Sequence, residues 1–250
     1  MKLLVVNPNI TASVSRLIED EARRAASPGT AITMLTARFG VAYIETRFEA
    51  LIGAYAAAEL VAEHHAGHDA LIVAAFGDPG VPGLREALDI PVVGLTEAAL
   101  ASACLLGHRF SIVAISRRIT AWYRAAVESN GLVGRLASIR SLDSPLRDIG
   151  SVQADHAARL RELCTAVVDE DGADVIILGG APLAGLARSI AGEIPVPVVD
   201  GVSSAVRHAE SLAALQPGAA RAGSFAPPPA KANAGLSAAM QALLARARPG

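Results

Sequence analysis

The sequence is poor in the residues that build disulfide and metal sites. Its 250 residues contain two cysteines and six histidines. Cys104 and Cys164 give no disulfide framework and no ligand spacing of the zinc type. His64, His65 and His68 form the one histidine cluster, and their pattern matches no metal motif. We therefore expect no metal site and no bound cofactor.

Neither the charge nor the apolar pattern points to nucleic acid or to a membrane. The formal net charge is −2 at pH 7, so no bulk attraction to polyanions is expected. No run reaches the ~18 uncharged apolar residues of a membrane span. The apolar stretch Leu3–Val6 ends at Asn7-Pro8-Asn9, too early for a signal peptide. We expect a cytoplasmic protein that binds neither nucleic acid nor membrane.

Three common catalytic or nucleotide-binding motifs are also missing. The chain has no Gly-x-Ser-x-Gly elbow, no P-loop and no dinucleotide-binding fingerprint. The sequence therefore gives no support to an α/β-hydrolase, a P-loop nucleotidase or a dinucleotide-dependent dehydrogenase.

What the sequence has is an internal repeat. Residues 69–75 read Asp-Ala-Leu-Ile-Val-Ala-Ala, and residues 174–180 read Asp-Val-Ile-Ile-Leu-Gly-Gly. Each copy continues with a turn that contains proline, a helix-compatible stretch that opens Gly-Leu, and a short apolar strand after proline. Two such copies predict two similar α/β halves whose equivalent turns face one cleft. The turn positions hold Ala75 and Gly180, which have no reactive side chains.

Strand and helix patterns alternate along the whole chain. Short apolar runs between longer helical patterns are typical of parallel sheets with helices on both faces. The predicted strands are Leu3–Val6, Ala31–Thr36, Ala70–Ala74, Pro91–Gly94, Phe110–Ile115, Ala137–Ser141, Val175–Leu178 and Val196–Val199. The predicted helices are Ala12–Ala26, Glu45–Ala66, Val81–Leu88, Thr96–Leu106, Thr120–Ser129, Val152–Glu170, Leu183–Ile190, Gly201–Leu215 and Leu236–Ala247.

The fold class is therefore α/β, with two pseudo-symmetric domains that are each a short parallel sheet flanked by helices. We place residues 1–106 plus 201–250 in the first domain and residues 107–200 in the second. Residues 216–235 are rich in proline, glycine and alanine, which predicts an extended strap. The site is expected in the cleft between the two domains.

Polar and glycine-containing turns follow the predicted strands at this cleft. Asn7 and Asn9 offer amide donors and acceptors just past the first strand, although Asn9 or Thr11 can instead cap the next helix. Gly77 and Gly180 let backbone N–H groups approach an anion, although glycine also simply permits tight turns. We expect the pair of turns to bind a carboxylate or an enolate-like anion.

Several segments, in their order and spacing, resemble one enzyme family. They are Asn7-Pro8-Asn9, Phe39–Glu45, Phe76–Gly80, Val199–Val202 and Ala222–Pro229. Together they are similar to the aspartate/glutamate/hydantoin racemase superfamily, and most of all to its hydantoin and allantoin racemase branch. In the stretch 39–45, Tyr43 stands where that branch usually has serine. The resemblance spans essentially the whole chain.

The resemblance implies a two-domain fold with a small-molecule site between the halves and no cofactor. Family racemases carry one thiol in each of the two turns, and these thiols move a proton between the two faces of the α-carbon. Here the two positions are Ala75 and Gly180. Cys104 and Cys164 fall in predicted helices outside both turns, where a small buried side chain is the simpler interpretation. The two-thiol mechanism therefore does not transfer.

Few groups are available to replace the thiols as acid and base. We predict Asp78 and Glu45 as catalytic, although Asp78 can also cap a helix and Glu45 can be a helix-start charge. Ser116 and Arg117 occupy a turn of the second half, where Arg117 can equally be a solvated surface charge. The predicted substrate-binding residues are Asn7, Asn9, Ala75, Phe76, Gly77, Ser116, Arg117, Gly179, Gly180 and Ala181.

Two classes of function stay open. The first is a cofactor-independent enzyme, an isomerase by resemblance, that acts beside a carbonyl or carboxylate of a small amino-acid derivative or cyclic ureide. A lyase, decarboxylase or hydrolase on a small carboxylate is the alternative within this class. The second class is a catalytically silent small-molecule binder. The ligand is expected to be small and anionic, and the protein to be a homo-oligomer.

Overall fold

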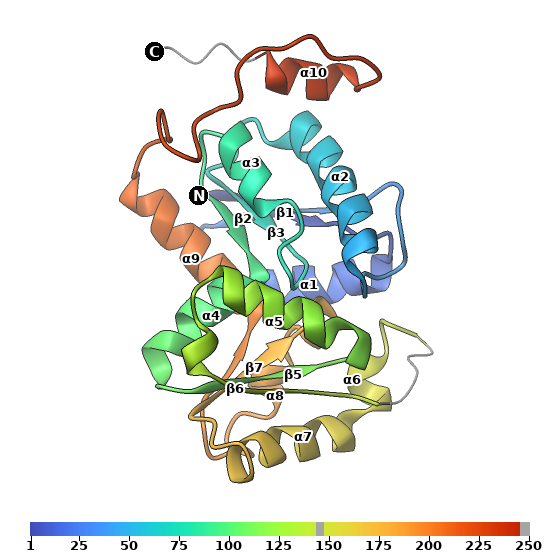
Figure 1. Cartoon of the computed structure of the whole chain (residues 1–250), viewed down its shortest axis with the longest axis vertical. Helices are drawn as coiled ribbons and strands as arrows, with labels where there is room; N and C mark the ends of the chain where they lie inside the picture. The colour runs from blue at the N-terminus through green and yellow to red at the C-terminus, as the bar shows by residue number, and fades with distance from the viewer. Residues whose placement is uncertain (144–147, 246–250) are drawn as a thin grey trace.

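A computed structural model describes residues 1–143 and 148–245 of the chain, and it contains two parallel sheets that lie one above the other in Figure 1. The first sheet has the order β2-β1-β3-β4, and the second has the order β6-β5-β7-β8. The strands of the first sheet are β1 (Lys2–Asn7), β2 (Ala31–Thr36), β3 (Ala70–Val73) and β4 (Val92–Gly94). Those of the second are β5 (Phe110–Ala114), β6 (Leu136–Ser141), β7 (Val175–Gly179) and β8 (Val198–Asp200).

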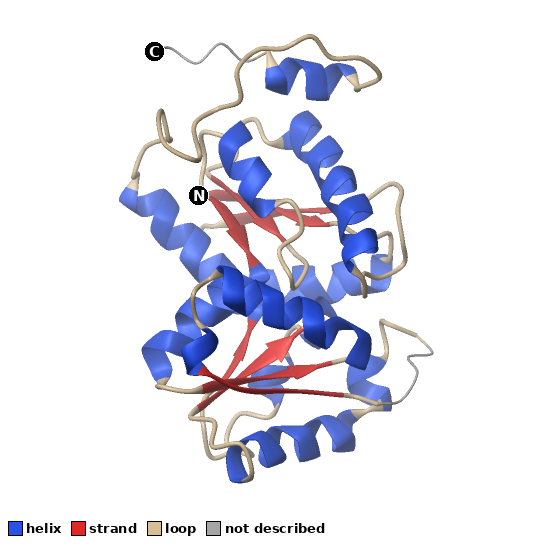
Figure 2. Ribbon diagram, viewed as in Figure 1, coloured by secondary structure: helices blue, strands red, loops and turns tan. Residues whose placement is uncertain are grey.

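Helices cover both faces of each sheet (Figure 2). The α-helices are α1 (Ala12–Ala25), α2 (Arg47–His64), α3 (Val81–Ala87), α4 (Leu95–Leu106), α5 (Thr120–Ser129), α6 (Val152–Asp155), α7 (Ala157–Asp169), α8 (Leu186–Ser189), α9 (Gly201–Leu215) and α10 (Ala238–Leu244). Three short 3₁₀ helices are η1 (Arg117–Ile119), η2 (Val133–Arg135) and η3 (Ala181–Leu183). The predicted fold class is thereby confirmed.

The register of the strands shows why the repeat begins with aspartate in both halves. Strand β1 pairs with β3, and β5 pairs with β7, in equivalent registers. The Asp69 carboxylate accepts the N–H of Lys2 at 2.7 Å, and the Asp174 carboxylate accepts the N–H of Arg109 at 2.7 Å. Each aspartate thus fixes the start of the neighbouring strand, and the Arg109 amide helps to lower the pKa of Asp174.

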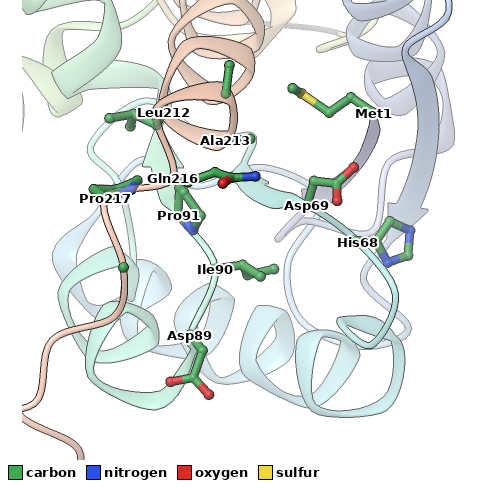
Figure 3. Close-up of a pocket in the computed structure, with 12 residues that line it drawn as sticks. Met1, His68, Asp69, Asp89, Ile90, Pro91, Leu212, Ala213, Gln216 and Pro217 are labelled. Atoms are coloured by element: carbon green, nitrogen blue, oxygen red, sulfur yellow. The ribbon is translucent and has the colours of Figure 1, made fainter.

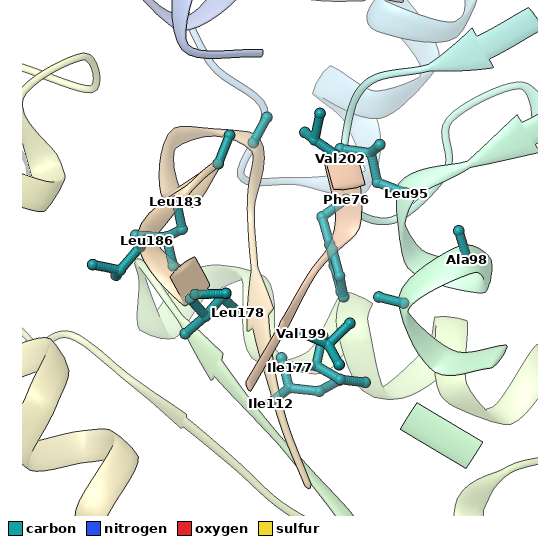
Figure 4. Close-up of a cluster of buried hydrophobic side chains, with 14 of the residues drawn as sticks. Phe76, Leu95, Ala98, Ile112, Ile177, Leu178, Leu183, Leu186, Val199 and Val202 are labelled. Carbon is teal, nitrogen blue, oxygen red and sulfur yellow. The ribbon is translucent and has the colours of Figure 1, made fainter. Parts of the chain in front are cut away.

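The two halves exchange a helix. Helix α4 follows β4 of the first sheet but packs on β7 and β8 of the second, and α9 follows β8 but packs on β3 and β4. The two helices also pack on each other, between the sheets. One hydrophobic cluster runs through this region and includes Ile72 of β3 and Ile177 of β7. Figure 4 shows Ile177 in this cluster together with Leu95 of α4 and Val202 of α9.

Most predicted elements have the predicted positions, and the long helix predicted over Val152–Glu170 is the main difference. It is broken at His156 into α6 and α7. The side chain of Gln153 donates to the backbone oxygens of Pro182 and Ala184, both at 2.9 Å. These bonds attach α6 to the segment 182–184. Residues 246–247 of the predicted last helix lie outside the described residues.

Residues 216–235 form an irregular segment, called the strap here, which leads from α9 to α10. Helix α10 packs on α2, with Leu243 buried there. The division into domains at residues 106 and 201 stays a prediction. Within residues 1–143 and 148–245, no helix has both the length and the apolar composition to cross a membrane.

Candidate functional site

The two turns of the repeat meet in one small cavity. It lies at the carboxyl ends of β3 and β7 and has a volume of about 40 Å³. We call it the central cavity. Its lining residues are Asn9, Tyr43, Ile44, Ala75, Phe76, Ile115, Tyr123, Ile149, Gly180, Ala181 and Pro182. Ala75 and Gly180, which come from different halves, therefore face the same space.

Gly180 has a backbone conformation that other residues rarely adopt. Its φ is +135°, and it precedes the 3₁₀ helix η3. A Cβ at this position would meet nothing closer than Pro182 Cδ at 3.6 Å and the Tyr123 hydroxyl at 3.8 Å. The space would accept a side chain, but the backbone as it stands would be strained by one.

Tyr123 presents an unpartnered hydroxyl beside Gly180. Its ring is buried and packs against Phe76, with the ring centroids 4.6 Å apart. Its hydroxyl makes no hydrogen bond within the part of the chain that the structure describes, and the residue lines the central cavity. Burial, and to a smaller extent the charge of Asp78, raises the pKa of Tyr123. The phenol is therefore neutral at pH 7 and is available as a proton donor.

Tyr43 is the second phenol of the cavity. Burial raises its pKa, and the negative charges of Glu45 and Glu49 raise it further, against a smaller opposing effect of Arg118. Glu45 does not line the cavity itself, but it lies close enough to act on Tyr43. Glu49 is committed to the capping box of α2, where it accepts the Thr46 N–H at 2.9 Å.

A buried hydrogen-bond network holds Asn9 in the cavity wall. The Asn7 side chain is fully buried, and its Nδ2 donates to Asn9 Oδ1 at 3.1 Å and to Ser15 Oγ at 2.9 Å. Asn9 Oδ1 also accepts the N–H of Thr11 at 3.0 Å. Because Oδ1 is occupied and no described residue accepts from Nδ2, Asn9 can donate to a ligand. Asn7 supports Asn9 and does not line the cavity.

Asp78 lies behind the cavity wall and caps a helix. Its Oδ1 accepts the N–H of Thr96 at 2.8 Å, and its Oδ2 accepts the N–H of Glu97 at 2.9 Å. These amides open α4, whose own N-cap residue is Gly94. A Cβ on Gly94 would lie 2.3 Å from Asp78 Cγ, so glycine makes room for the carboxylate. Burial raises the pKa of Asp78 to about 7, although the amide donors oppose this.

Other predicted site residues serve the local structure. Ser116 accepts the Arg118 N–H at 3.2 Å and so caps η1, and Arg117 is exposed. A Cβ on Gly179 would lie 2.8 Å from Ile112 and 3.0 Å from the Tyr123 ring. At Gly77, where φ is +100°, a Cβ would lie 2.2 Å from the Trp122 ring. Glycine at both positions permits close packing.

Five of the predicted site residues therefore line the central cavity, and the roles of all of them stay predictions. The five are Asn9, Ala75, Phe76, Gly180 and Ala181. No motif in the sequence singled out Tyr123. The feature that could have revealed it is a tyrosine on the predicted helix that follows the Ser116 turn. An ordinary core residue fits the same position.

Neither cysteine lines the central cavity. Cys164 is fully buried on α7, and burial raises the pKa of its thiol to about 11. Cys104 is half-buried on α4. Among residues 1–143 and 148–245, no three His, Cys, Asp or Glu side chains gather in a way that could hold a metal ion.

A larger cavity lies elsewhere, at the amino-terminal ends of the strands of the first sheet. It has a volume of about 560 Å³ and lies between Met1, Asp69, the segment 89–91 and the end of α9 (Figure 3). Parallel α/β sheets bind their ligands at the opposite, carboxyl ends of the strands. Position in the sheet therefore favours the small central cavity as the candidate site.

The comparisons with known proteins agree with this geometry. The family described as Asp/Glu/Hydantoin racemase matches residues 3–209. The hydantoin racemase of Paenarthrobacter aurescens is 36% identical over 238 residues, which are 92% of this chain and 99% of that protein. The structure of the allantoin racemase from Klebsiella pneumoniae has a TM-score of 0.91 and 34% identity, with 96% of this chain and 98% of that chain covered. The allantoin racemase structure from Pseudomonas fluorescens has a TM-score of 0.88 and 37% identity, with 94% and 100% covered. The resemblance noted in the sequence is thus confirmed, and this chain belongs to the Asp/Glu/hydantoin racemase family of enzymes.

Proposed function

We propose that this protein moves a proton at the carbon beside a carbonyl group in a small amino-acid derivative or cyclic ureide, without a cofactor and without thiols. The observation that carries the proposal is the meeting of Ala75 and Gly180 in one cavity whose ionisable lining groups are the phenols of Tyr43 and Tyr123. The named relatives act on hydantoin and allantoin, which supports a cyclic ureide as the substrate class.

The cavity has donors for the oxygen of such a substrate. Removal of a proton beside a carbonyl places negative charge on the carbonyl oxygen, and donors held in place stabilise that charge. Asn9 Nδ2 is free to donate, and the Asn7 and Thr11 bonds to Asn9 Oδ1 fix its orientation. Asn9 therefore holds the carbonyl oxygen of the substrate in this proposal.

The two phenols supply the proton chemistry. Tyr123 is neutral at pH 7 because burial raises its pKa, so it gives a proton to the carbanion. Tyr43 lies near Glu45, which can take the phenol proton while Tyr43 takes the substrate proton. The proton lost by carbon ends on Tyr43, the Tyr43 proton ends on Glu45, and the proton of Tyr123 ends on carbon. Glu45 then loses its extra proton to solvent and the Tyr123 phenolate takes one from solvent, which restores the enzyme.

Decarboxylation is the second candidate. The phenols of the cavity are protonated at neutral pH, so each carries a proton to donate and has to lose it before it can act as a base. Loss of carbon dioxide from a malonate-type acid forms a carbanion and requires no catalytic base. The carbanion then needs one proton donor. Tyr123 alone meets this need.

Hydrogen exchange in deuterated water separates these possibilities. Hydantoins, amino acids and substituted malonates are incubated with the protein, and NMR follows the α-hydrogen and the release of carbon dioxide. Exchange with a hydantoin supports the isomerase, and turnover of malonates alone supports the decarboxylase. Tyr123→Phe should slow either reaction by ~10²-fold or more. Binding without exchange or turnover would mean that the protein is a catalytically silent small-molecule binder.

Thiol alkylation is the matched control for the mechanism. Iodoacetamide should leave the activity intact, because Cys104 and Cys164 lie outside the central cavity. Loss of activity that substrate prevents would show that a thiol takes part after all.

A further inference from the structure

Helix α2 carries large apolar side chains on the face that it turns to solvent. Phe48 is 72% exposed, Leu51 is 69% exposed and Tyr55 is 43% exposed. They follow one another at intervals of three and four residues, so they share one face of the helix. Phe39, which is 42% exposed, extends this face, because the centroids of its ring and the Tyr55 ring are 5.8 Å apart. We call these four residues the α2 patch.

The opposite face of α2 is already buried in the first half of the molecule. Ala57, Leu60 and Val61 belong to the hydrophobic cluster beneath the helix, and Leu243 of α10 joins the same cluster. Figure 1 shows α2 on the outside of this half, away from the crossed helices α4 and α9. Apolar residues on both faces are typical of a helix that is buried all round. The composition of α2 therefore indicates a cover for its outer face that the described part of one chain does not supply.

A groove lies beside the patch, along the carboxyl-terminal half of α2. Its volume is about 230 Å³, and its lining residues are Arg38, Phe39, Tyr55, Ala56, Glu59, Leu60 and Glu63. Phe48 and Leu51 are exposed on the amino-terminal half of the same helix, and Phe48 lies roughly 16 Å from Glu59 along the axis. One surface thus carries both a protrusion and a depression. A two-fold axis across the middle of α2 places the protrusion of each copy in the groove of the other.

The charges at the two ends of α2 favour the same antiparallel arrangement. Arg47 begins the helix, and its guanidinium donates to the Ala121 oxygen at 3.1 Å. Glu59 lies at the groove and accepts the Tyr55 hydroxyl at 2.8 Å. Neither Arg47 nor Glu59 belongs to an ion pair within residues 1–143 and 148–245. When two α2 helices lie antiparallel, the basic end of each lies over the acidic end of the other, and their helix dipoles also attract.

The size of the α2 patch suits the centre of an interface between two copies. Fully exposed side chains of this size offer about 150–250 Å² each, so the four residues together expose roughly 400 Å². Each partner in a stable complex buries about 800 Å², with an apolar centre and a polar rim. The patch provides about half of that area, and the charged residues around the groove provide the rim.

We propose that a second copy of this chain binds the α2 patch in a two-fold dimer, with Phe48 and Leu51 of each copy in the groove of the other.

This dimer covers the outer side of a segment whose inner side lines the central cavity. The segment 38–46 packs on α2, because Phe39 contacts Tyr55 and a Cβ on Gly53 would lie 2.6 Å from Ile44. The same segment brings Tyr43 and Ile44 to the central cavity. The partner copy therefore supports one wall of the candidate site from outside.

Analytical ultracentrifugation tests the interface without any assay of activity. At micromolar concentration the wild type should have the mass of two chains or a multiple of it. Leu51→Lys should raise the dissociation constant of the dimer by about tenfold or more, because it places a charge in the apolar centre. The control is Leu105→Lys on α4, a residue that is also exposed, which should leave the mass unchanged. A wild type with the mass of one chain, or an assembly that Leu51→Lys does not weaken, would overturn the inference.

Reversal of the end charges tests the antiparallel arrangement. Arg47→Glu and Glu59→Arg should each weaken the dimer by about tenfold, since like charges then meet at both ends of the helix pair. An equimolar mixture of the two variants should form mixed dimers about as tight as the wild type, because opposite charges face each other again. Native mass spectrometry distinguishes the mixed dimer by its mass. A mixture that associates no better than either variant alone would contradict the proposed pairing of the two helices.

Discussion

Replacing Asp78 with asparagine tests whether this carboxylate titrates near neutral pH. Its pKa is raised to about 7 from an ordinary value of 3.8, with burial as the main cause. Between these two values the folded protein binds more protons at this site than the unfolded chain does. Stability must then fall as pH rises through this interval. Asparagine has no titration, so the variant lacks this contribution.

The size of the effect follows from the shift. Each unit of pKa difference corresponds to about 1.4 kcal/mol. The free energy of unfolding of the wild type, relative to Asp78→Asn, should decrease by about 2–3 kcal/mol from about pH 5 to about pH 8 and then level off. A second difference in the free energy of unfolding, which does not depend on pH, adds to this one. The Asn Nδ2 group cannot accept a hydrogen bond from the α4 amide that it faces. An unpaired buried donor costs about 1–3 kcal/mol at every pH.

Urea unfolding at a series of pH values measures the difference. The control is Asp20→Asn, an exposed aspartate on α1, for which we expect a change within about 0.5 kcal/mol. A difference for Asp78→Asn that stays constant or grows with pH would refute the reasoning. It would mean that the two amide donors and the N-terminus of α4 keep Asp78 ionised.

The same variant tests the predicted catalytic role of Asp78. A carboxyl group with a pKa near 7 is well suited to acid–base chemistry. Its geometry, however, assigns both oxygens to the α4 amides. We expect Asp78→Asn to change stability and to leave the rate per folded molecule within a few-fold of the wild type. A loss of ~10²-fold or more in kcat with unchanged stability would make Asp78 catalytic.

Three further changes have clear expected outcomes. Gly180→Ala should lower the free energy of unfolding by about 1–3 kcal/mol because its φ is +135°, and urea unfolding against Ala75→Ser as a control checks this. Asn7→Leu should remove a hydrogen-bond donor from Asn9 and Ser15, so urea denaturation should show a free energy of unfolding lower by about 1–3 kcal/mol. Ligand binding should weaken as well, and unchanged affinity would mean that Asn9 needs no support from Asn7. Gly77→Ala should displace the Trp122 ring, and a red shift of its emission would report this; an unchanged emission spectrum would contradict the contact.

The sequence predicted the fold well because the periodicities are local. The helix Gly201–Leu215 has the predicted bounds, and the strand Ala31–Thr36 does as well. The repeat also predicted that Ala75 and Gly180 share a site, since equivalent turns follow equivalent strands. The break at His156 was missed because no local pattern marks it, and the short α6 before it is attached by Gln153 to the segment 182–184, a contact that the sequence does not show.

The chemistry of the site was harder to predict from sequence. The Asp78 carboxylate binds amides that lie 18 and 19 residues further along the chain, and no local pattern shows that contact. Trp122 and Tyr123 are neighbours on one helix, and no motif in the sequence singled out either of them. Only the fold shows that these two side chains line different cavities.

The exchange of α4 and α9 between the halves limits how a substrate can enter. A hinge that separated the two sheets would pull each helix off the sheet it covers, and exposed apolar surface costs about 25 cal/mol per Å². The segment 38–46 forms part of the cavity wall. It brings Tyr43 and Ile44 to the cavity, and it is tied to the start of α1 by the bond from Ile10 N–H to the Val41 oxygen at 3.1 Å and by the Thr11 hydroxyl on the Ala42 oxygen. The crossed helices thus resist a hinge motion between the sheets, and access to the central cavity has to come without separating them.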